Sequence, residues 1–380
     1  MGKATKGMKQ VVKQILSLLP FMVAGGLVGN FGMDYLGTSA IGQAIMRRPA
    51  LGIGALLLSL YLAFFIQVIA HEAGHMVFGL LTGYGFSSFR VGSLTWVKMD
   101  DRIRLKRLGL AGTGGQCLMT PPELKDGRYP VMLYNLGGSL MNLLLAGLCG
   151  LLLLLRPNPY VAAFLAITAL LGLLLGLLNG IPIKTKLVNN DGHNALMLTK
   201  DATARQVFWQ VLAINEQQVK GLRLKEMPGD WFELPDEKQL QNGVTALAAI
   251  THCQRLLDEG QFQQADMQMA RILQIKSGLV GLNRQLMQAD RLYCLAIAGG
   301  GAEGAQAMMT KEYLRFVKAM KRYPAVLRTQ YALALLCDKD QARAEQLLAA
   351  FDKQAQRHPN PAEIACERAL IAIAQARAQG

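Results

Sequence analysis

Residues 51–89 read LGIGALLLSLYLAFFIQVIAHEAGHMVFGLLTGYGFSSF, and Glu72 is the only Asp, Glu, Lys or Arg in the run. A helix needs about 20 mostly apolar residues to cross the roughly 30 Å of hydrocarbon in a bilayer. The run is long enough to do so, and it predicts a transmembrane helix. Its few ionisable groups lie close together, where lipid makes polar side chains costly unless they find partners.

Three further stretches are almost free of charged residues, so we expect about four transmembrane helices. Hydrophobic residues make up 52% of the chain and charged residues 17%, against roughly 25% in soluble domains. This composition excludes a single soluble domain and a disordered chain, and six scattered Cys do not indicate a disulfide framework. No cleavage pattern follows the first stretch, which we therefore interpret as a helix and not a signal peptide. The three stretches are Gln14–Met33, Tyr129–Leu155 and Pro157–Ile183.

The formal net charge is +14, and residues 1–200, with 18 Lys and Arg against 7 Asp and Glu, carry +11 of it. Basic loops set the orientation of membrane proteins, so this charge predicts contact with membrane lipid and no nucleic-acid partner. With four spans, the basic segments share one side, which predicts a multi-pass cell-membrane protein with a cytosolic N-terminus, site opening and C-terminal domain. Arg47 and Arg48 lie on the opposite side. The basic segments are residues 3–13, 90–128 and 184–200.

The predicted helix contains the pattern H-E-x-x-H as His71, Glu72 and His75. Residues i and i+4 share one face of a helix, so both imidazoles can reach one metal ion. The Glu between them is placed to take a proton from an activated water. The alternative is a packed polar cluster that joins helices without a metal.

Two His leave a zinc ion short of a ligand, because catalytic zinc sites usually combine three protein ligands with an open position. His71 lies 20 residues after Leu51, and Asn179 lies 20 residues after Pro159, so each is about 30 Å along its predicted helix. Asp191 follows the later helix and can fold back to the same depth, so it is the predicted third ligand. His193 is a weaker alternative. The other candidates are Asp34, Asp100 and Asp101.

These motifs resemble the site-2 protease family of intramembrane zinc metalloproteases, over roughly residues 50–195. That family pairs a transmembrane H-E-x-x-H helix with a later helix that ends in N-x-x-P…D-G. The counterparts here are His71-Glu72-x-x-His75, then Asn179-Gly180-Ile181-Pro182 and Asp191-Gly192. The stretch Gly137–Asn142 resembles the G-x-x-x-N segment of the third span. The gap of nine residues from Pro182 to Asp191 is longer than the usual one.

The resemblance implies one Zn²⁺ bound by His71, His75 and Asp191, with Glu72 as the general base. It also implies that Asn142 and Asn179 orient the substrate or stabilise the oxyanion. Helix–helix hydrogen bonds are an alternative role for both amides, since an Asn in lipid needs a partner.

Between the second and third spans, apolar residues alternate on either side of Asp100-Asp101. This pattern predicts a small β-hairpin within residues 82–128, which could pair with an unwound substrate. The alternative is a surface loop that holds the helices in register. The alternating residues are Leu94, Trp96, Ile103 and Leu105.

The second half of the chain has the composition of a soluble helical domain. We divide the sequence into a transmembrane domain (1–199), a linker (200–241) and a cytosolic helical-repeat domain (242–380). The pattern Leu256-Leu257-x-x-Gly260-x-Phe262-x-x-Ala265 resembles the junction of a tetratricopeptide repeat. Such repeats usually bind a peptide or protein on their concave face. The alternative is a plain helical bundle.

The sequence therefore predicts an all-α polytopic membrane protein with a cytosolic helical domain. The predicted function is that of an intramembrane zinc metalloendopeptidase, whose substrate is a membrane protein or membrane peptide. One alternative is a metal-binding membrane scaffold that works through its helical domain. Another is a transporter with a His/Glu relay, although no internal repeat supports it.

Overall fold

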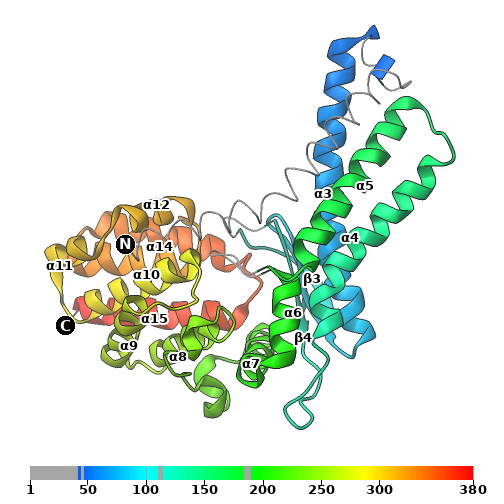
Figure 1. Cartoon of the computed structure of the whole chain (residues 1–380). Coiled ribbons are helices and arrows are strands. Elements are labelled where there is room, and N and C mark those ends of the chain that lie inside the picture. The colour runs from blue at the N-terminus through cyan, green and yellow to red at the C-terminus, as the bar shows by residue number, and fades with distance from the viewer. Residues whose placement is uncertain (1–41, 44–46, 100, 110–113, 184–189, 380) are drawn as a thin grey trace, which may run out of the picture. The chain divides into compact units, whose positions relative to one another are not determined.

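The computed structural model describes the chain except for residues 1–41, 44–46, 100, 110–113, 184–189 and 380 (Figure 1). The predicted first span, Gln14–Met33, lies outside the described residues. The described residues form two compact units. The first contains the described residues up to Gln67 together with Leu144–Leu173, and the second contains the described residues of 68–143 and those from Leu174 onward.

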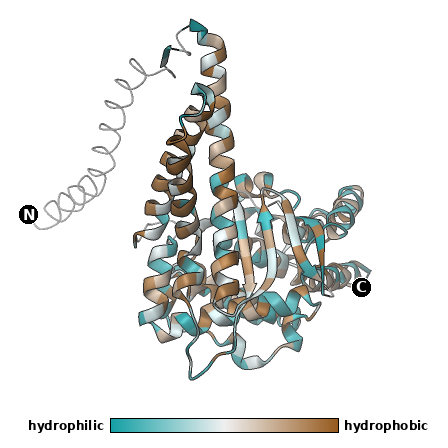
Figure 2. Ribbon diagram, turned by 90° about the vertical axis from the view of Figure 1, so that its right-hand side faces the viewer, coloured by the Kyte–Doolittle hydropathy of each residue, from teal (hydrophilic) through white to brown (hydrophobic). Residues whose placement is uncertain are grey.

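Three helices in the described part of the chain have the length and composition of membrane spans. They correspond to the second, third and fourth predicted spans, and Figure 2 shows their hydrophobic colouring. Large apolar side chains on them are exposed, such as Leu57 at 63% and Leu151 at 64%. Such exposure is unfavourable in water and is expected for side chains that face lipid. The helices are α3 (Pro49–Leu81), α4 (Met132–Leu153) and α5 (Pro159–Gly180).

Within the first unit, one polar contact joins two apolar helices. Gln67 on α3 is fully buried, and its Nε2 donates to the backbone oxygen of Thr168 on α5 at 2.8 Å. The Thr168 hydroxyl bonds back to Phe164 O, one turn earlier in its own helix. An amide in an apolar bundle needs such a partner, so this bond fixes the register of α3 and α5.

Within the second unit, α3 and α4 approach each other through glycines. A Cβ on Gly74 would collide with the backbone oxygen of Gly137, and a Cβ on Gly137 would lie 2.5 Å from Gly74 O. On α5, a Cβ at Gly176 would lie 2.7 Å from the Leu143 side chain. Small residues at these positions allow the backbones to pack closely, as in other membrane helix pairs.

The segment after α3 folds into a four-stranded antiparallel sheet of order β3-β2-β1-β4. The predicted hairpin is present as β2 and β3, with Trp96 opposite Leu105 and a turn at Asp101, where φ is 56°. The sheet is larger than the predicted hairpin, because β1 and β4 pair with each other and add two strands. The strands are β1 (Gly85–Val91), β2 (Leu94–Met99), β3 (Arg102–Arg107) and β4 (Gly115–Thr120).

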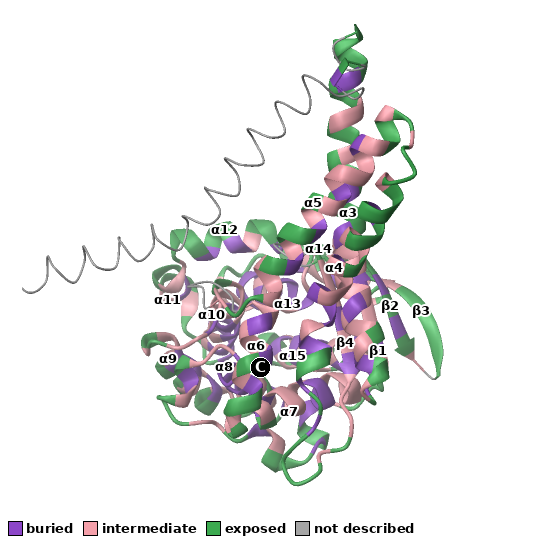
Figure 3. Cartoon of the chain, turned by 45° about the vertical axis from the view of Figure 1, so that its right-hand side comes forward, coloured by how far each residue is buried: buried purple, intermediate pink, exposed green. Residues whose placement is uncertain are grey.

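The two additional strands lack the alternation that marks the hairpin. Buried and half-buried residues follow one another along β1 and β4, whereas β3 is exposed along most of its length (Figure 3). β1 mixes Gly, Ser, Phe and Arg without alternating, and β4 contains the apolar run 117–119, so periodicity alone does not identify either strand.

Two helices follow α5, α6 (Asp191–Lys200) and α7 (Ala202–Val219), with Asp201 capping the start of α7. The segment predicted to be a linker therefore contains an 18-residue helix and three short 3-10 turns. Trp209 on α7 donates through Nε1 to Pro122 O at 2.8 Å, and Phe208 packs on the cluster that contains Tyr134. Packing of these aromatic residues explains why the segment is ordered. The short turns are η1 (Leu224–Glu226), η2 (Gly229–Phe232) and η3 (Gln239–Gln241).

The C-terminal part of the second unit is helical. Its first two helices form the hairpin predicted from residues 256–265, with Gly260 at φ 77° in the turn and Ala265 fully buried. The π-helical segment η4 (Leu333–Cys337) continues α13, and all six cysteines are free. The helices are α8 (Ala246–Asp258), α9 (Phe262–Gln274), α10 (Gly281–Ile297), α11 (Gly301–Met308), α12 (Lys311–Ala319), α13 (Pro324–Ala332), α14 (Gln341–Ala355) and α15 (Pro361–Gln379).

The contact between Gly74 and Gly137 gives a stability prediction. Gly137→Ala should lower the thermal unfolding midpoint of the detergent-solubilised protein, because overpacking of a close contact costs about 1–3 kcal/mol. Gly147→Ala on the same helix is the matched control, since nothing lies within 4 Å of its added Cβ. Equal midpoints for the two variants would contradict the close approach of α3 and α4.

Candidate metal centre

Three side chains from two helices converge at the end of α3. His71 and His75 lie one turn apart on α3, and Asp191 is the first residue of α6. His71 Nε2 lies 3.1 Å from Asp191 Oδ2 and 3.2 Å from His75 Nε2, and His75 Nε2 lies 3.6 Å from Asp191 Oδ2. The structure therefore brings together the three residues predicted to bind a metal, and they form the one group of at least three such ligands among the described residues.

Each imidazole is held by its other nitrogen. His75 Nδ1 lies 2.8 Å from the backbone oxygen of Tyr134, and His71 Nδ1 lies 2.8 Å from Asn142 Oδ1. Both oxygens accept, so each Nδ1 carries a proton, and each ring in its neutral form presents the lone pair of Nε2 to the centre of the group. This arrangement is typical of metal-binding His residues, whose second nitrogen donates to an oxygen.

The geometry fits a tetrahedral metal ion. Ligands at the usual zinc distances of about 2.0–2.1 Å lie about 3.3 Å apart in a tetrahedron. The three measured separations, 3.1, 3.2 and 3.6 Å, match this spacing. Asp191 Oδ2 is buried, and its neighbours are the Nε2 atoms of His71 and His75, at 3.1 and 3.6 Å. A cation at the centre of the triangle would satisfy all three atoms.

Asn190 fixes the position of Asp191. Its Oδ1 accepts from the backbone nitrogens of His193 and Ile183, and its Nδ2 donates to Leu178 O at 2.7 Å. It therefore caps the start of α6 and joins it to the end of α5. The long gap after Pro182 does not carry Asp191 away, because Asn190 returns the chain to the helix end.

Close packing supports the same turn, since a Cβ on Gly192 would collide with Gly180 O. The sequence reasoning did not identify Asn190. The sequence feature that could have identified it is an Asn directly before the first residue of a helix, which is a common capping position. His193, the alternative ligand, is not part of the convergent group among the described residues.

The two intramembrane amides occupy different environments. Asn142 is fully buried on α4 and accepts from His71, so it orients a metal-ligand candidate. Asn179 Nδ2 donates to Leu175 O at 3.1 Å, one turn back in its own helix. Neither observation tests contact with a substrate, and that role stays a prediction for both residues.

Glu72 lies beside strand β4. A Cβ on Gly115 would come within 2.6 Å of Glu72 Cγ, and the backbone amide of Cys117 donates to the Glu72 carboxylate. Glu72 also interacts electrostatically with His71 and Asp191. Two adjacent elements, α3 and β4, thus place a carboxylate next to the three convergent ligands.

A buried guanidinium supports this part of β4. Arg90 on β1 is 2% exposed, and it donates to Gly92 O at 2.8 Å and to Gly115 O at 3.2 Å. Burial lowers the pKa of Arg90, and the charge of Glu72 opposes that shift. Arg90 therefore holds the Gly115 backbone where it contacts Glu72.

Aromatic residues and a glycine complete the wall around the two His. The Tyr134 hydroxyl donates to Cys117 O at 3.1 Å, and its ring stacks on Tyr84 at 4.6 Å between centroids. A Cβ on Gly138 would lie 2.6 Å from the His71 ring. The side chains of His71, His75 and Asp191 remain 17%, 13% and 24% exposed, so the group is largely but not fully buried.

Comparison of the chain with protein-family models, with characterised proteins and with solved structures found no significant match.

The hydrogen bond from His71 to Asn142 gives a prediction about metal affinity. Asn142→Ala should weaken binding of Zn²⁺ by about 10–100-fold, because loss of such a partner frees the imidazole to rotate. Competition with a chelating dye measures the affinity. Asn135→Ala is the control, since Asn135 is buried on the same helix but donates to Val131 O. An unchanged affinity in Asn142→Ala would show that the amide does not orient the ligand.

Proposed function

We propose that the protein is an intramembrane zinc metalloendopeptidase that hydrolyses a peptide bond in or near a transmembrane segment of another protein. The observation that carries the proposal is the convergence of His71, His75 and Asp191 beside Glu72, at the end of a helix with the character of a membrane span. Two His and a carboxylate are a common ligand set of hydrolytic zinc sites.

In this proposal His71, His75 and Asp191 hold one Zn²⁺. The metal, when bound, would lower the pKa of water and polarise the scissile carbonyl. Asn142 and the Tyr134 carbonyl keep the two imidazoles in the protonation state that allows binding. Partial exposure of the three ligands leaves room for an open coordination position and for water.

Glu72 acts as the general base. It accepts a proton from the attacking water, whose oxygen forms a bond to the carbonyl carbon of the scissile peptide. The carbon–nitrogen bond then breaks, and the proton passes from Glu72 to the departing nitrogen. The products are a carboxylate and an amine. Cys117 and Gly115 hold the Glu72 side chain in place for these transfers.

The surroundings of the site favour a membrane-embedded substrate. The ligands lie about 33 Å along α3 from Pro49, close to the thickness of the hydrocarbon layer, so the site falls near one membrane face. From the distribution of basic residues in the sequence we expect that face to be the cytosolic one. We expect an unwound substrate segment to run along β4, which pairs with β1 on one side and faces Glu72 on the other.

Substitution of the general base gives the central test. Glu72→Gln should bind Zn²⁺ as the unmodified protein does but cleave at least about 100-fold more slowly, because an amide accepts no proton from water. The assay uses zinc-loaded protein in lipid vesicles and a set of single-span peptides, with products identified by mass spectrometry. Glu123→Gln, an exposed carboxylate in the same unit, is the control.

The non-proteolytic scaffold makes the opposite prediction. Absence of cleavage by the zinc-loaded unmodified protein, or equal cleavage by Glu72→Gln, would count against the peptidase. The function of the protein would then be partner binding by the helical domain.

Two adjacent glycines allow a separate test of β4. Gly115→Ala should reduce cleavage with little change in zinc affinity, because the added methyl group displaces Glu72 and does not touch the ligands. Gly114→Ala is the matched control, since its Cβ would make only an ordinary contact, 3.7 Å from Val68. Comparable rates for the two variants would remove β4 from the positioning of Glu72.

A further inference from the structure

Helix α12 and the turn after it carry an unbalanced charge. Residues 311–322 contain five Lys and Arg and one acid, Glu312. Residues 201–380 as a whole contain 22 Lys and Arg and 19 Asp and Glu, so without this segment they contain 17 and 18. The whole positive excess of the second half of the chain therefore lies in this one segment. Its cations, which we call the basic face, are Lys311, Arg315, Lys318, Lys321 and Arg322.

The fold holds the basic face toward solvent. On the other side of α12, Tyr313, Phe316 and Met320 are buried in the main hydrophobic core of the helical domain. All five cations of the basic face are exposed, and Figure 3 shows exposed colouring along this helix. Because its aromatic side is fixed in the core, α12 cannot turn its cations inward.

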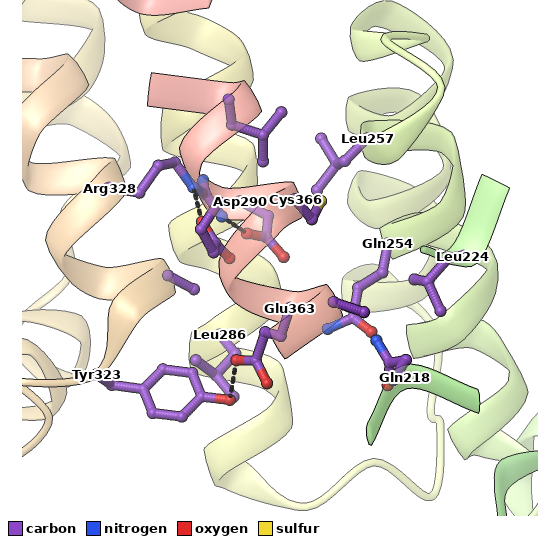
Figure 4. A pocket seen from close by; sticks show the side chains of 14 residues that line it. Gln218, Leu224, Gln254, Leu257, Leu286, Asp290, Tyr323, Arg328, Glu363 and Cys366 are labelled. Carbon is purple, nitrogen blue, oxygen red and sulfur yellow. Dashed lines mark hydrogen bonds and ion pairs between the residues drawn. The ribbon is translucent and has the colours of Figure 1, made fainter. Parts of the chain in front are cut away.

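The helical domain pairs its other cations with acids. In a charged cavity of about 100 Å³ lined by α7, α8, α10, α13 and α15, buried Arg328 donates to Asp290 at 2.5 Å and to Glu367 at 2.8 Å (Figure 4). Within the described part of the chain, no cation of the basic face forms an ion pair with a carboxylate, whereas five other arginines of the domain do. Those pairs are Arg255–Glu259, Arg271–Glu237, Arg291–Asp266, Arg343–Asp338 and Arg368–Asp352.

A helix face of one sign is unfavourable in solution. Lys311 and Arg315 lie at the spacing i, i+4, and Arg315 and Lys318 at i, i+3, where like charges repel each other. Solvated helix faces usually mix both signs, whereas a face of one sign is favourable against a surface of opposite charge. Leu314 is 47% exposed beside these cations, which gives the surface an apolar side chain as well.

The membrane is an anionic surface that stays within reach of α12. Helices α6 and α7 lead from Asp191 at the metal centre into the helical domain. Arg205 on α7 donates through Nε to Gly127 O at 2.9 Å, and the Tyr129 hydroxyl donates to Arg205 O at 3.0 Å, just before α4 begins. Within this second unit, Figures 1 and 3 both show α12 on the side of the helical domain toward which α4 runs.

We infer that the basic face of α12 binds the anionic phospholipid headgroups of the membrane that this chain spans, with Leu314 at the boundary of the acyl chains. Cytosolic leaflets are negatively charged and attract basic segments close to the membrane, and apolar side chains among the cations strengthen such contacts. This contact would hold the helical domain against the membrane in one orientation. It depends on membrane attachment of the chain and does not require peptidase activity.

Chemical labelling of lysines tests the contact in the full chain. The protein is placed in nanodiscs of phosphatidylcholine alone or of phosphatidylcholine with phosphatidylglycerol, and a neutral acetylating reagent is added. Mass spectrometry gives the labelling rate of each lysine. Lys311, Lys318 and Lys321 should react about five-fold more slowly or less in the anionic nanodiscs, because the headgroups cover them, and high salt should abolish the difference. Exposed Lys238 and Lys276, outside the basic face, should react equally in both.

A double substitution connects the protection to the charge of α12. Arg315→Gln with Lys318→Gln removes two cations and adds no carboxylate that could pair with the remaining lysines. Labelling of Lys311 in anionic nanodiscs should then approach its rate in phosphatidylcholine. Lys238→Gln with Lys276→Gln is the matched control, which removes the same charge elsewhere and should leave the protection unchanged. Unfolding midpoints verify that both variants fold.

Equal labelling of the basic face in the two kinds of nanodisc, or equal protection in the two double variants, would overturn the inference. Protection in phosphatidylcholine nanodiscs by soluble glycerol phosphate or by an oligonucleotide, to the extent seen with phosphatidylglycerol, would also overturn it, because the ligand would then be a soluble anion. The assay uses neither metal nor Glu72, so a negative result leaves the peptidase proposal intact. Lipid-dependent protection in a protein that cleaves nothing would retain the membrane contact and refute the peptidase.

Discussion

The candidate metal centre depends on holding His71, His75 and Asp191 within 4 Å of one another near the end of an apolar helix. The holding groups are oxygens and amides outside the triangle: Asn142 and the Tyr134 carbonyl fix the two rings, and Asn190 fixes the carboxylate. Glycines at the helix contacts allow these groups to approach. A divalent cation bound at this convergence would satisfy all three ligand atoms at once, which would link metal binding to the stability of the fold.

Several features of this centre could be predicted from sequence because they are local. The i, i+4 spacing of His71 and His75 and the apolar run around them specify a helix with both rings on one face. The return of Asp191 could be expected from helix length. The capping role of Asn190 and the contact between Gly115 and Glu72 could not, because both depend on where the chain lies after a turn of unknown geometry.

The same distinction applies to the rest of the fold. The hairpin of β2 and β3 alternates and could be predicted, whereas the sequences of β1 and β4 carry no clear apolar period. In the helical domain, the glycine turn at Gly260 allowed one pair of helices to be predicted. The charged cavity has no sequence signature, because Asp290, Arg328 and Glu367 meet only through packing of three separate helices.

Strand β4 brings a thiol close to the metal centre. Cys117 is buried there as a free cysteine, and burial together with the charge of Glu72 raises the pKa of its thiol to about 12. At neutral pH the sulfur therefore keeps its proton, and only the thiolate is a strong ligand for soft metals. In this protonated form Cys117 is a weak metal ligand and reacts slowly with oxidants, although its sulfur lies beside Glu72.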